Sequence, residues 1–107
     1  MTAGKTVLAL STFPDAETAR RISKQLVSER FAACANILPA VESTYRWKDK
    51  IESGNEALVF FKVSEQRQSE FQEKLRSLHP HEVPEIIFVP IANGLPEYLA
   101  WVADSCG

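Results

Sequence analysis

Four short apolar runs, separated by two amphipathic stretches, constrain the fold of this chain more than any other feature. Apolar runs of this length, bounded by polar residues, predict strands that are buried or half-buried. They lie at residues 5–10, 34–38, 57–63 and 86–89. The second run continues past Pro39, and from Val41 onward apolar and polar residues alternate, so we expect this strand to be long.

The two stretches between the runs have the spacing of amphipathic helices. The first spans residues 15–30, and its apolar side consists of Ala19, Ile22, Leu26 and Val27. The second begins after Ser64 and stops at Pro80, and its apolar side consists of Phe71, Leu75 and Leu78. Asp15 is expected to cap the first helix with its side chain. A short third helix is expected from Pro96.

The order of these elements is β-α-β-β-α-β followed by a C-terminal helix. It predicts an α+β fold of the ferredoxin-like sandwich type, in which four antiparallel strands form a sheet and both long helices pack on one face. A chain of 107 residues can bury a core without metal ions or disulfide bonds. We therefore expect a single domain over residues 1–107.

The hairpin of the two middle strands is predicted to be longer than the helices beside it. Its turn lies at residues 48–50, and the return strand from Ile51 is expected to be interrupted at residues 53–55. The hairpin arms reach roughly 40 Å at about 3.3 Å per residue, whereas the first helix covers only about 24 Å. The overhang carries Tyr45 and Trp47, which are expected either at a subunit interface or folded back on the C-terminal helix.

Composition and motifs exclude several classes of function. The net charge of −2 gives no general attraction to nucleic acid or to anionic membranes. No apolar run approaches the roughly 20 residues that cross a bilayer, and no cleavable leader is recognisable. Cys34 and Cys106 form no CxxC pair, so we expect reduced thiols in a cytoplasmic protein. Because phosphate loops and nucleophile elbows are missing from the sequence, we predict no enzyme activity and assign no catalytic residue.

The segment His79-Pro80-His81 is the main candidate for ligand chemistry. Pro80 favours an extended backbone at His79, and side chains two residues apart in an extended segment project to the same side. Both imidazoles could then bind one divalent cation, with Glu82 or Glu85 close by. The alternative is that His79 ends the preceding helix, where positive charge is favourable, and that His81 is exposed.

Glu85 and Lys62 are two further candidate polar residues. Glu85 lies at the mouth of the last strand, and it belongs either to an intersubunit cleft or to a solvated strand end. Lys62 interrupts the apolar run 57–63, and it points either into such a cleft or outward from a half-exposed strand. Together with Tyr45 and Trp47, these residues define the predicted cleft.

Several segments, in the same order and spacing, resemble the CutA family, which is named for divalent-cation tolerance. They extend from about Val7 to Val102, and they include Phe13-Pro14-Asp15, Arg30-Phe31-Ala32-Ala33-Cys34, Tyr45-Arg46-Trp47 and His79-Pro80-His81-Glu82-Val83-Pro84-Glu85. The resemblance implies a homotrimer of ferredoxin-like subunits, similar in design to the PII signalling proteins, with hairpins that reach neighbouring subunits. It also implies a cytosolic protein involved in tolerance of copper and other divalent metals, without an established catalytic activity.

The chain departs from the family pattern at four positions. Ser11 stands where some members have a cysteine that is a proposed copper ligand, and a proposed His-His pair appears as Leu78-His79. His81 stands where a tyrosine is usual, and it either replaces the lost imidazole or is incidental. Asp49 stands where a glycine is common in the hairpin turn.

Together these observations predict a CutA-like homotrimer that binds a divalent cation weakly, with copper as the main possibility, and that requires no cofactor. The alternative is a PII-like signalling module that binds a small ligand in its intersubunit clefts and acts on a protein partner. A transferase would require a nucleophile beside a base, and the sequence offers no such pair.

Overall fold

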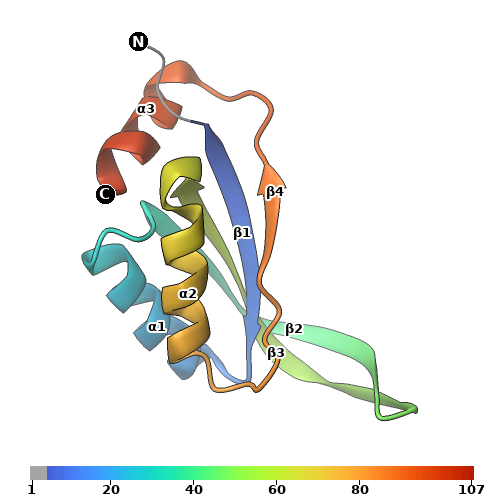
Figure 1. The fold of residues 1–107 in the computed structure, drawn as a ribbon. Coiled ribbons are helices and arrows are strands. Elements are labelled where there is room, and N and C mark those ends of the chain that lie inside the picture. Colours follow the sequence, from blue (N-terminus) through green and yellow to red (C-terminus); the bar gives the residue numbers. More distant parts are fainter. Residues whose placement is uncertain (1–4) are drawn as a thin grey trace.

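Four antiparallel strands form one sheet in the order β2-β3-β1-β4, and two long helices cover one of its faces (Figure 1). This computed structural model describes residues 5–107. The elements, in chain order, are β1 (Thr6–Phe13), α1 (Ala16–Ser28), β2 (Cys34–Trp47), β3 (Lys50–Ser64), a 3-10 turn (Glu65–Arg67), α2 (Gln68–Leu78), β4 (Ile87–Pro90) and α3 (Pro96–Ser105). The predicted α+β, ferredoxin-like fold is confirmed.

Helix α1 begins where the sequence predicts. The side chain of Asp15 accepts a hydrogen bond from the Thr18 N–H at 2.7 Å, and this bond lowers the pKa of the carboxyl. The helix ends at Ser28, two residues before the expected Arg30, which adopts a left-handed φ of 66°. Ser64 does not cap α2 with its side chain, because a 3-10 turn lies between them.

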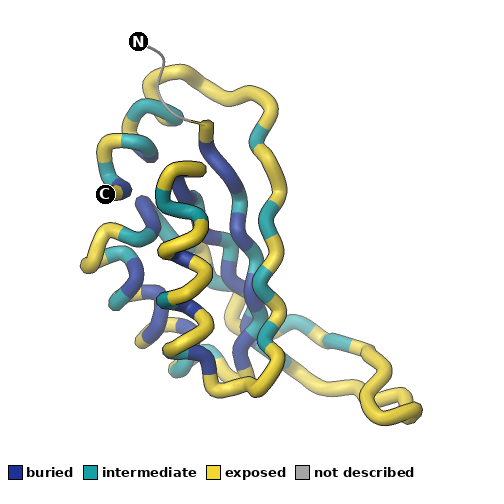
Figure 2. The backbone as a smooth tube through the Cα atoms, viewed as in Figure 1, coloured by how far each residue is buried: buried dark blue, intermediate teal, exposed yellow. Residues whose placement is uncertain are grey.

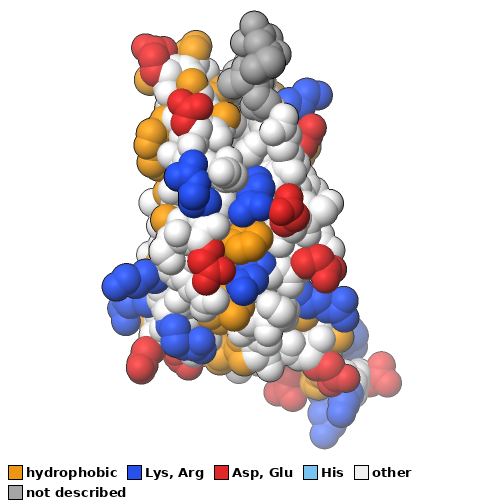
Figure 3. All heavy atoms as spheres, turned by 60° about the vertical axis from the view of Figure 1, so that its left-hand side comes forward, with side chains coloured by type: hydrophobic (Ala, Val, Ile, Leu, Met, Phe, Trp, Pro, Cys, Tyr) orange, Lys and Arg blue, Asp and Glu red, His pale blue; other side chains and the backbone are white. Residues whose placement is uncertain are grey.

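The core lies between the sheet and the two helices (Figure 2). Alternate residues of the central strands point into it: Ala9 pairs with Phe61, and Phe13 pairs with Ala57. The Phe61 ring meets the Phe71 ring of α2 edge to face, with centroids 5.1 Å apart. On the outer surface of the helix layer, acidic and basic side chains are intermixed (Figure 3).

The hairpin of β2 and β3 projects beyond the helix layer, as predicted from its length (Figure 1). The molecule extends 50 Å along this direction and only 25 × 22 Å across it. The interruption expected at residues 53–55 was wrong, because Gly54 pairs with Ser43 in a continuous ladder. The turn places Lys48 and Asp49 at φ 50° and 65°, the left-handed backbone of a tight hairpin connection.

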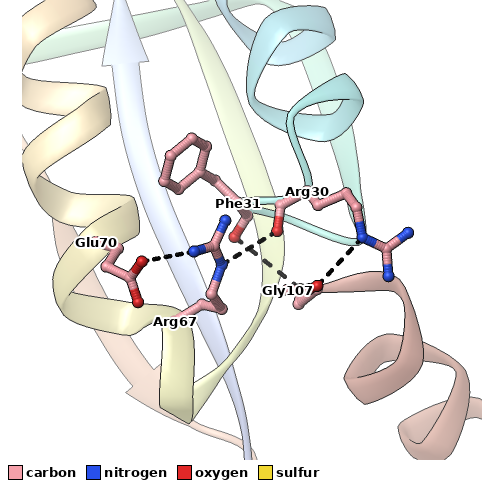
Figure 4. Close-up of polar contacts among 6 residues, drawn as sticks. Arg30, Phe31, Arg67, Glu70 and Gly107 are labelled. Atoms are coloured by element: carbon pink, nitrogen blue, oxygen red, sulfur yellow. Dashed lines mark hydrogen bonds and ion pairs between the residues drawn. The ribbon is translucent and has the colours of Figure 1, made fainter.

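Helix α3 packs at the end of the molecule opposite the hairpin tip (Figure 1). Its C-terminal end is held by Arg30, whose guanidinium donates to the Asp104 carbonyl at 2.6 Å. The same guanidinium donates to the Gly107 carbonyl at 3.4 Å (Figure 4). Beside it, Arg67 lies 4.4 Å from the centre of the Phe31 ring and pairs with Glu70. Because α3 is so far from the tip, the alternative that the hairpin rings fold back on this helix was wrong.

Candidate functional site

An open cavity of about 760 Å³ lies where the loop after α2 passes the base of the hairpin. It is lined by Thr12, Ser43, Thr44, Tyr45, Trp47, Glu56, Pro80, His81, Glu82, Val83 and Glu85. Five of the residues singled out from the sequence therefore lie together: Tyr45, Trp47, His81, Glu82 and Glu85. The lining residues that belong to strands, apart from Thr44, lie on the face of the sheet that the helices leave open.

Glu56 is the charged wall residue that sequence reasoning missed. It lies in β3 directly opposite Val41 of β2, at the point where the hairpin leaves the body of the fold. The only signal in the sequence is an acidic side chain immediately before the apolar run 57–63. That position does not reveal the loop at residues 80–85, which faces it from 24 to 29 residues further along the chain.

His79 is buried at the end of α2, with 8% of its surface exposed. Its Nε2–H donates to the Thr12 carbonyl at 2.8 Å, and its Nδ1 accepts from the His81 backbone N–H at 3.1 Å. The ring stacks on Phe13 with centroids 4.7 Å apart. Burial lowers the pKa of His79, and nearby His81 lowers it further, whereas the bond to Thr12 and the carboxylate of Glu56 act in the opposite direction.

These contacts bear on the alternative that His79 ends the helix as a positive charge. His79 does end α2, but burial lowers its pKa and so disfavours a charged ring there. The ring belongs to the packed interior, because Thr12 and Phe13 of β1 contact it. The His81 ring lies beside it, with centroids 4.9 Å apart, and remains exposed.

The described residues of one chain do not form a closed metal site. Both ring nitrogens of His79 are already hydrogen-bonded, and the single lone pair of the neutral ring, on Nδ1, already accepts from the His81 N–H, which leaves none free for a cation. Across residues 5–107, no cluster of three or more His, Cys, Asp or Glu side chains is arranged to hold a metal ion. The residues that fit a cation best are the exposed imidazole of His81 and the carboxylates that share its cavity.

Comparison with known proteins places this architecture in one family. The family model described as CutA1 divalent ion tolerance protein matches residues 7–105. The chain belongs to the CutA family. A protein of Thermus thermophilus named divalent-cation tolerance protein CutA is 42% identical over 100 residues, which make up 94% of this chain and 97% of that protein.

Solved structures of CutA proteins have the same fold. The crystal structure of CutA1 from Oryza sativa superimposes with a TM-score of 0.96 at 33% identity, covering 100% of this chain and 98% of that one. The protein from Archaeoglobus fulgidus, named a periplasmic divalent cation tolerance protein CutA, gives a TM-score of 0.90 at 31% identity over 94% of this chain and 97% of its own. Within residues 5–107, no helix is both long and apolar enough to cross a membrane.

Two positions at which this CutA chain departs from the family pattern lie in its interior. Ser11 is fully buried on the helix side of β1, and its hydroxyl has no hydrogen-bond partner among the described residues. Leu78 is half-buried and packs against the core. Neither side chain lines the cavity, whereas Thr12, the neighbour of Ser11, does.

Lys62 lies outside the cavity. Its ammonium group donates to the Asn36 side chain on the open face of the sheet. Its cross-strand neighbour Cys34 lies 3.7 Å from the Tyr98 hydroxyl, and that contact raises the pKa of Tyr98.

The open face of the sheet is apolar between Lys62 and the cavity. Leu38, Ile87 and Val89 keep 38%, 49% and 45% of their surface exposed. Half-buried Leu10, Leu58 and Phe60 lie among them on the same face. The cavity thus adjoins a continuous apolar surface that the helices do not cover.

Proposed function

We propose that this CutA-family chain acts in tolerance of divalent cations as a homotrimer that binds copper or another divalent cation weakly and catalyses no reaction. Family membership supports the role in cation tolerance. The observation that carries the binding is the cavity, in which the exposed His81 imidazole lies with Glu56, Glu82 and Glu85. Imidazole and carboxylate groups together suit borderline divalent cations.

Binding of a divalent cation in this cavity is expected to be weak. One free imidazole with carboxylates that do not converge makes an incomplete ligand set, so we expect affinities on the order of micromolar or poorer. The order of affinity should be copper over zinc, with magnesium far below, as is usual for imidazole donors. His79 can serve as the second ligand of the predicted pair only if it gives up its bond to the His81 N–H.

The trimer is supported by the open face of the sheet. A contiguous surface containing Leu38, Ile87 and Val89 is larger than the isolated apolar side chains that are ordinary on a monomer. Burying this surface between subunits would also cover one side of the projecting hairpin. Light scattering at low micromolar concentration is expected to report three chains, and a stable monomer would contradict the proposal.

A reducing compartment is supported by the two cysteines. Cys34 and Cys106 are both free thiols. Burial raises the pKa of Cys106, which keeps this thiol protonated and unreactive. We therefore infer a cytoplasmic location, although the relative from Archaeoglobus fulgidus is named as periplasmic.

Copper titration of three proteins tests the metal proposal. Wild type, His81→Ala and His79→Gln are compared by isothermal titration at about pH 7.5 and about pH 5.5, either side of the ordinary histidine pKa. A large loss in His81→Ala alone assigns the imidazole to His81, and equal losses in both variants support a two-histidine site. Unchanged affinity in both variants, or no weakening at the lower pH, would overturn binding through these imidazoles.

A second candidate function is a PII-like module that binds a small ligand and acts on a protein partner. The volume of the cavity favours it, because about 760 Å³ lies within the range of small-molecule sites and far exceeds the space that one metal ion needs. A thermal-shift screen with metabolites, set against the metal titration, separates the two functions.

A further inference from the structure

We propose that the cavity binds an organic ammonium ion, held between the rings of Tyr45 and Trp47 and the carboxylates of Glu56, Glu82 and Glu85. This inference rests on the second candidate function, ligand binding in the cavity, and names the chemical class of that ligand. It does not require metal binding.

The charge of the wall selects a cation. Three of the side chains that line the cavity are carboxylates, and none is a lysine or an arginine. Glu56 lines the same cavity as His81 and Glu82, so this carboxylate of the strand faces the loop wall. An anionic ligand would meet like charge on the strand side and on the loop side.

The aromatic rings select an organic cation over a bare metal ion. Tyr45 and Trp47 line the cavity, yet they keep 48% and 51% of their surface exposed. The face of an indole or phenol ring attracts an alkylammonium group, whose methyl or methylene groups also bury apolar surface against the ring. A hydrated metal ion gains little from such a wall.

The spacing of the acidic groups leads to the same ligand class. In the described part of the chain, no three carboxylate, imidazole or thiol groups are placed to coordinate one metal ion. A diffuse positive charge does not need convergent ligands at coordination distance, because it interacts with several carboxylates across a wider volume. The hydroxyl groups of Thr12 and Ser43, also in the wall, can orient a polar substituent on the same ligand.

Choline and its neutral isostere 3,3-dimethyl-1-butanol provide a direct test. The two molecules have the same shape and differ by the positive charge, so both are titrated into the full chain by calorimetry at low ionic strength. We expect choline to bind at least about tenfold more tightly than the neutral alcohol, as a partly desolvated cation–π contact with added carboxylates predicts. Equal binding of the two molecules, or no choline binding by folded protein, would overturn the proposal.

Matched variants locate the binding. Trp47→Leu is expected to weaken choline binding about threefold to tenfold, and Trp47→Phe, which keeps a ring face, to restore most of it. Glu85→Gln should weaken it similarly, whereas Glu73→Gln, an exposed residue of α2 outside the cavity, should not. Unchanged affinity in both Trp47→Leu and Glu85→Gln would overturn the proposal.

Copper distinguishes this proposal from the metal function. Each variant is also titrated with copper alone, and light scattering confirms that its assembly is unchanged. If copper binds but choline does not, the ammonium proposal fails and metal binding stands. If choline binds through Trp47 and Glu85 while copper does not bind, the ammonium proposal stands and the metal function fails.

Discussion

The two faces of the sheet are built from alternate residues of the same strands, yet they differ in how much surface they bury. On the helix-covered face, Ala9, Val59 and Phe61 are fully buried. On the open face, Leu38, Ile87 and Val89 keep between 38% and 49% of their surface exposed. Strands that are apolar on both faces are typical of sheets covered on both sides. The helices account for one cover, and the proposed trimer would supply the second.

The two faces also differ in what their residues do: the candidate binding cavity lies on one face, and residues that stabilise the fold lie on the other. The cavity and all of its strand-borne wall residues except Thr44 lie on the open face, next to the hairpin. The helix-covered face holds Ser11 and His79, which are buried and contribute to packing. Substitutions on the two faces should therefore have separable effects, either on the folding of each chain or on assembly and binding.

The largest effect is expected from Phe61→Ala. This ring is fully buried and packs against Phe71, so its loss should cost about 3–5 kcal/mol in the free energy of unfolding. Urea denaturation at several protein concentrations measures this loss.

Phe60→Ala, one residue away and on the open face, is the matched control. Its cost should depend on protein concentration, because it acts through association. If both variants lose the same stability at every concentration, the two faces do not differ as described.

Lysine substitutions on the open face should break the assembly. In Ile87→Lys/Val89→Lys, two half-exposed apolar side chains become charged, which should remove about 1–3 kcal/mol of association free energy per chain. Analytical ultracentrifugation should then show smaller species with native circular dichroism. The control Gln72→Lys/Glu73→Lys changes exposed positions of α2 and should leave the assembly intact. Dissociation in the control, or an unchanged trimer in the test variant, would contradict this assignment.

Acid should weaken the fold through His79 on the covered side. Burial lowers the pKa of this ring in the folded chain below the ordinary 6.5, so the unfolded chain binds its proton first as the pH falls. The contribution of His79 to stability is therefore complete above about pH 6.5 and is lost as the pH falls through the lowered, folded-state pKa.

The variant His79→Gln tests the predicted fall in stability with falling pH. Glutamine does not titrate and retains only part of the hydrogen bonding, so we expect a loss of about 1–2 kcal/mol at pH 7.5. The loss should shrink toward lower pH, because the wild type alone is destabilised by protonation of this ring. Urea denaturation at half-unit steps from pH 7.5 to 4.5 provides the measurement. A difference between the two proteins that stays constant with pH would show that His79 is not the titrating group.

The sequence predicted what depends on local pattern and missed what depends on distant contacts. The apolar periodicities, the Asp15 cap and the length of the hairpin were sufficient for the element order and the topology. The break expected at residues 53–55 was wrong because pairing with β2 overrides the weak strand propensity of Ser53-Gly54-Asn55. The burial of His79 and the role of Glu56 could not be predicted, since both depend on segments that meet only in the folded chain.

The smallest effect is expected at the hairpin tip, which projects away from the helix layer (Figure 1). Asp49 has a φ of 65°, and Lys48 before it a φ of 50°, so both occupy the left-handed region that glycine adopts without steric cost. In Asp49→Gly the relief of this backbone strain is opposed by the greater freedom of glycine in the unfolded chain. Aspartate also tolerates the left-handed region better than most residues do. We therefore expect a change in unfolding free energy within about 0.5 kcal/mol of zero, with copper and choline binding unchanged.

Lys48→Gly is the comparison, because a long side chain without that tolerance should gain more from the substitution. Thermal melts of the two variants measure the difference. A large loss of stability or assembly in Asp49→Gly would show that the tip is not free, but makes contacts with another subunit.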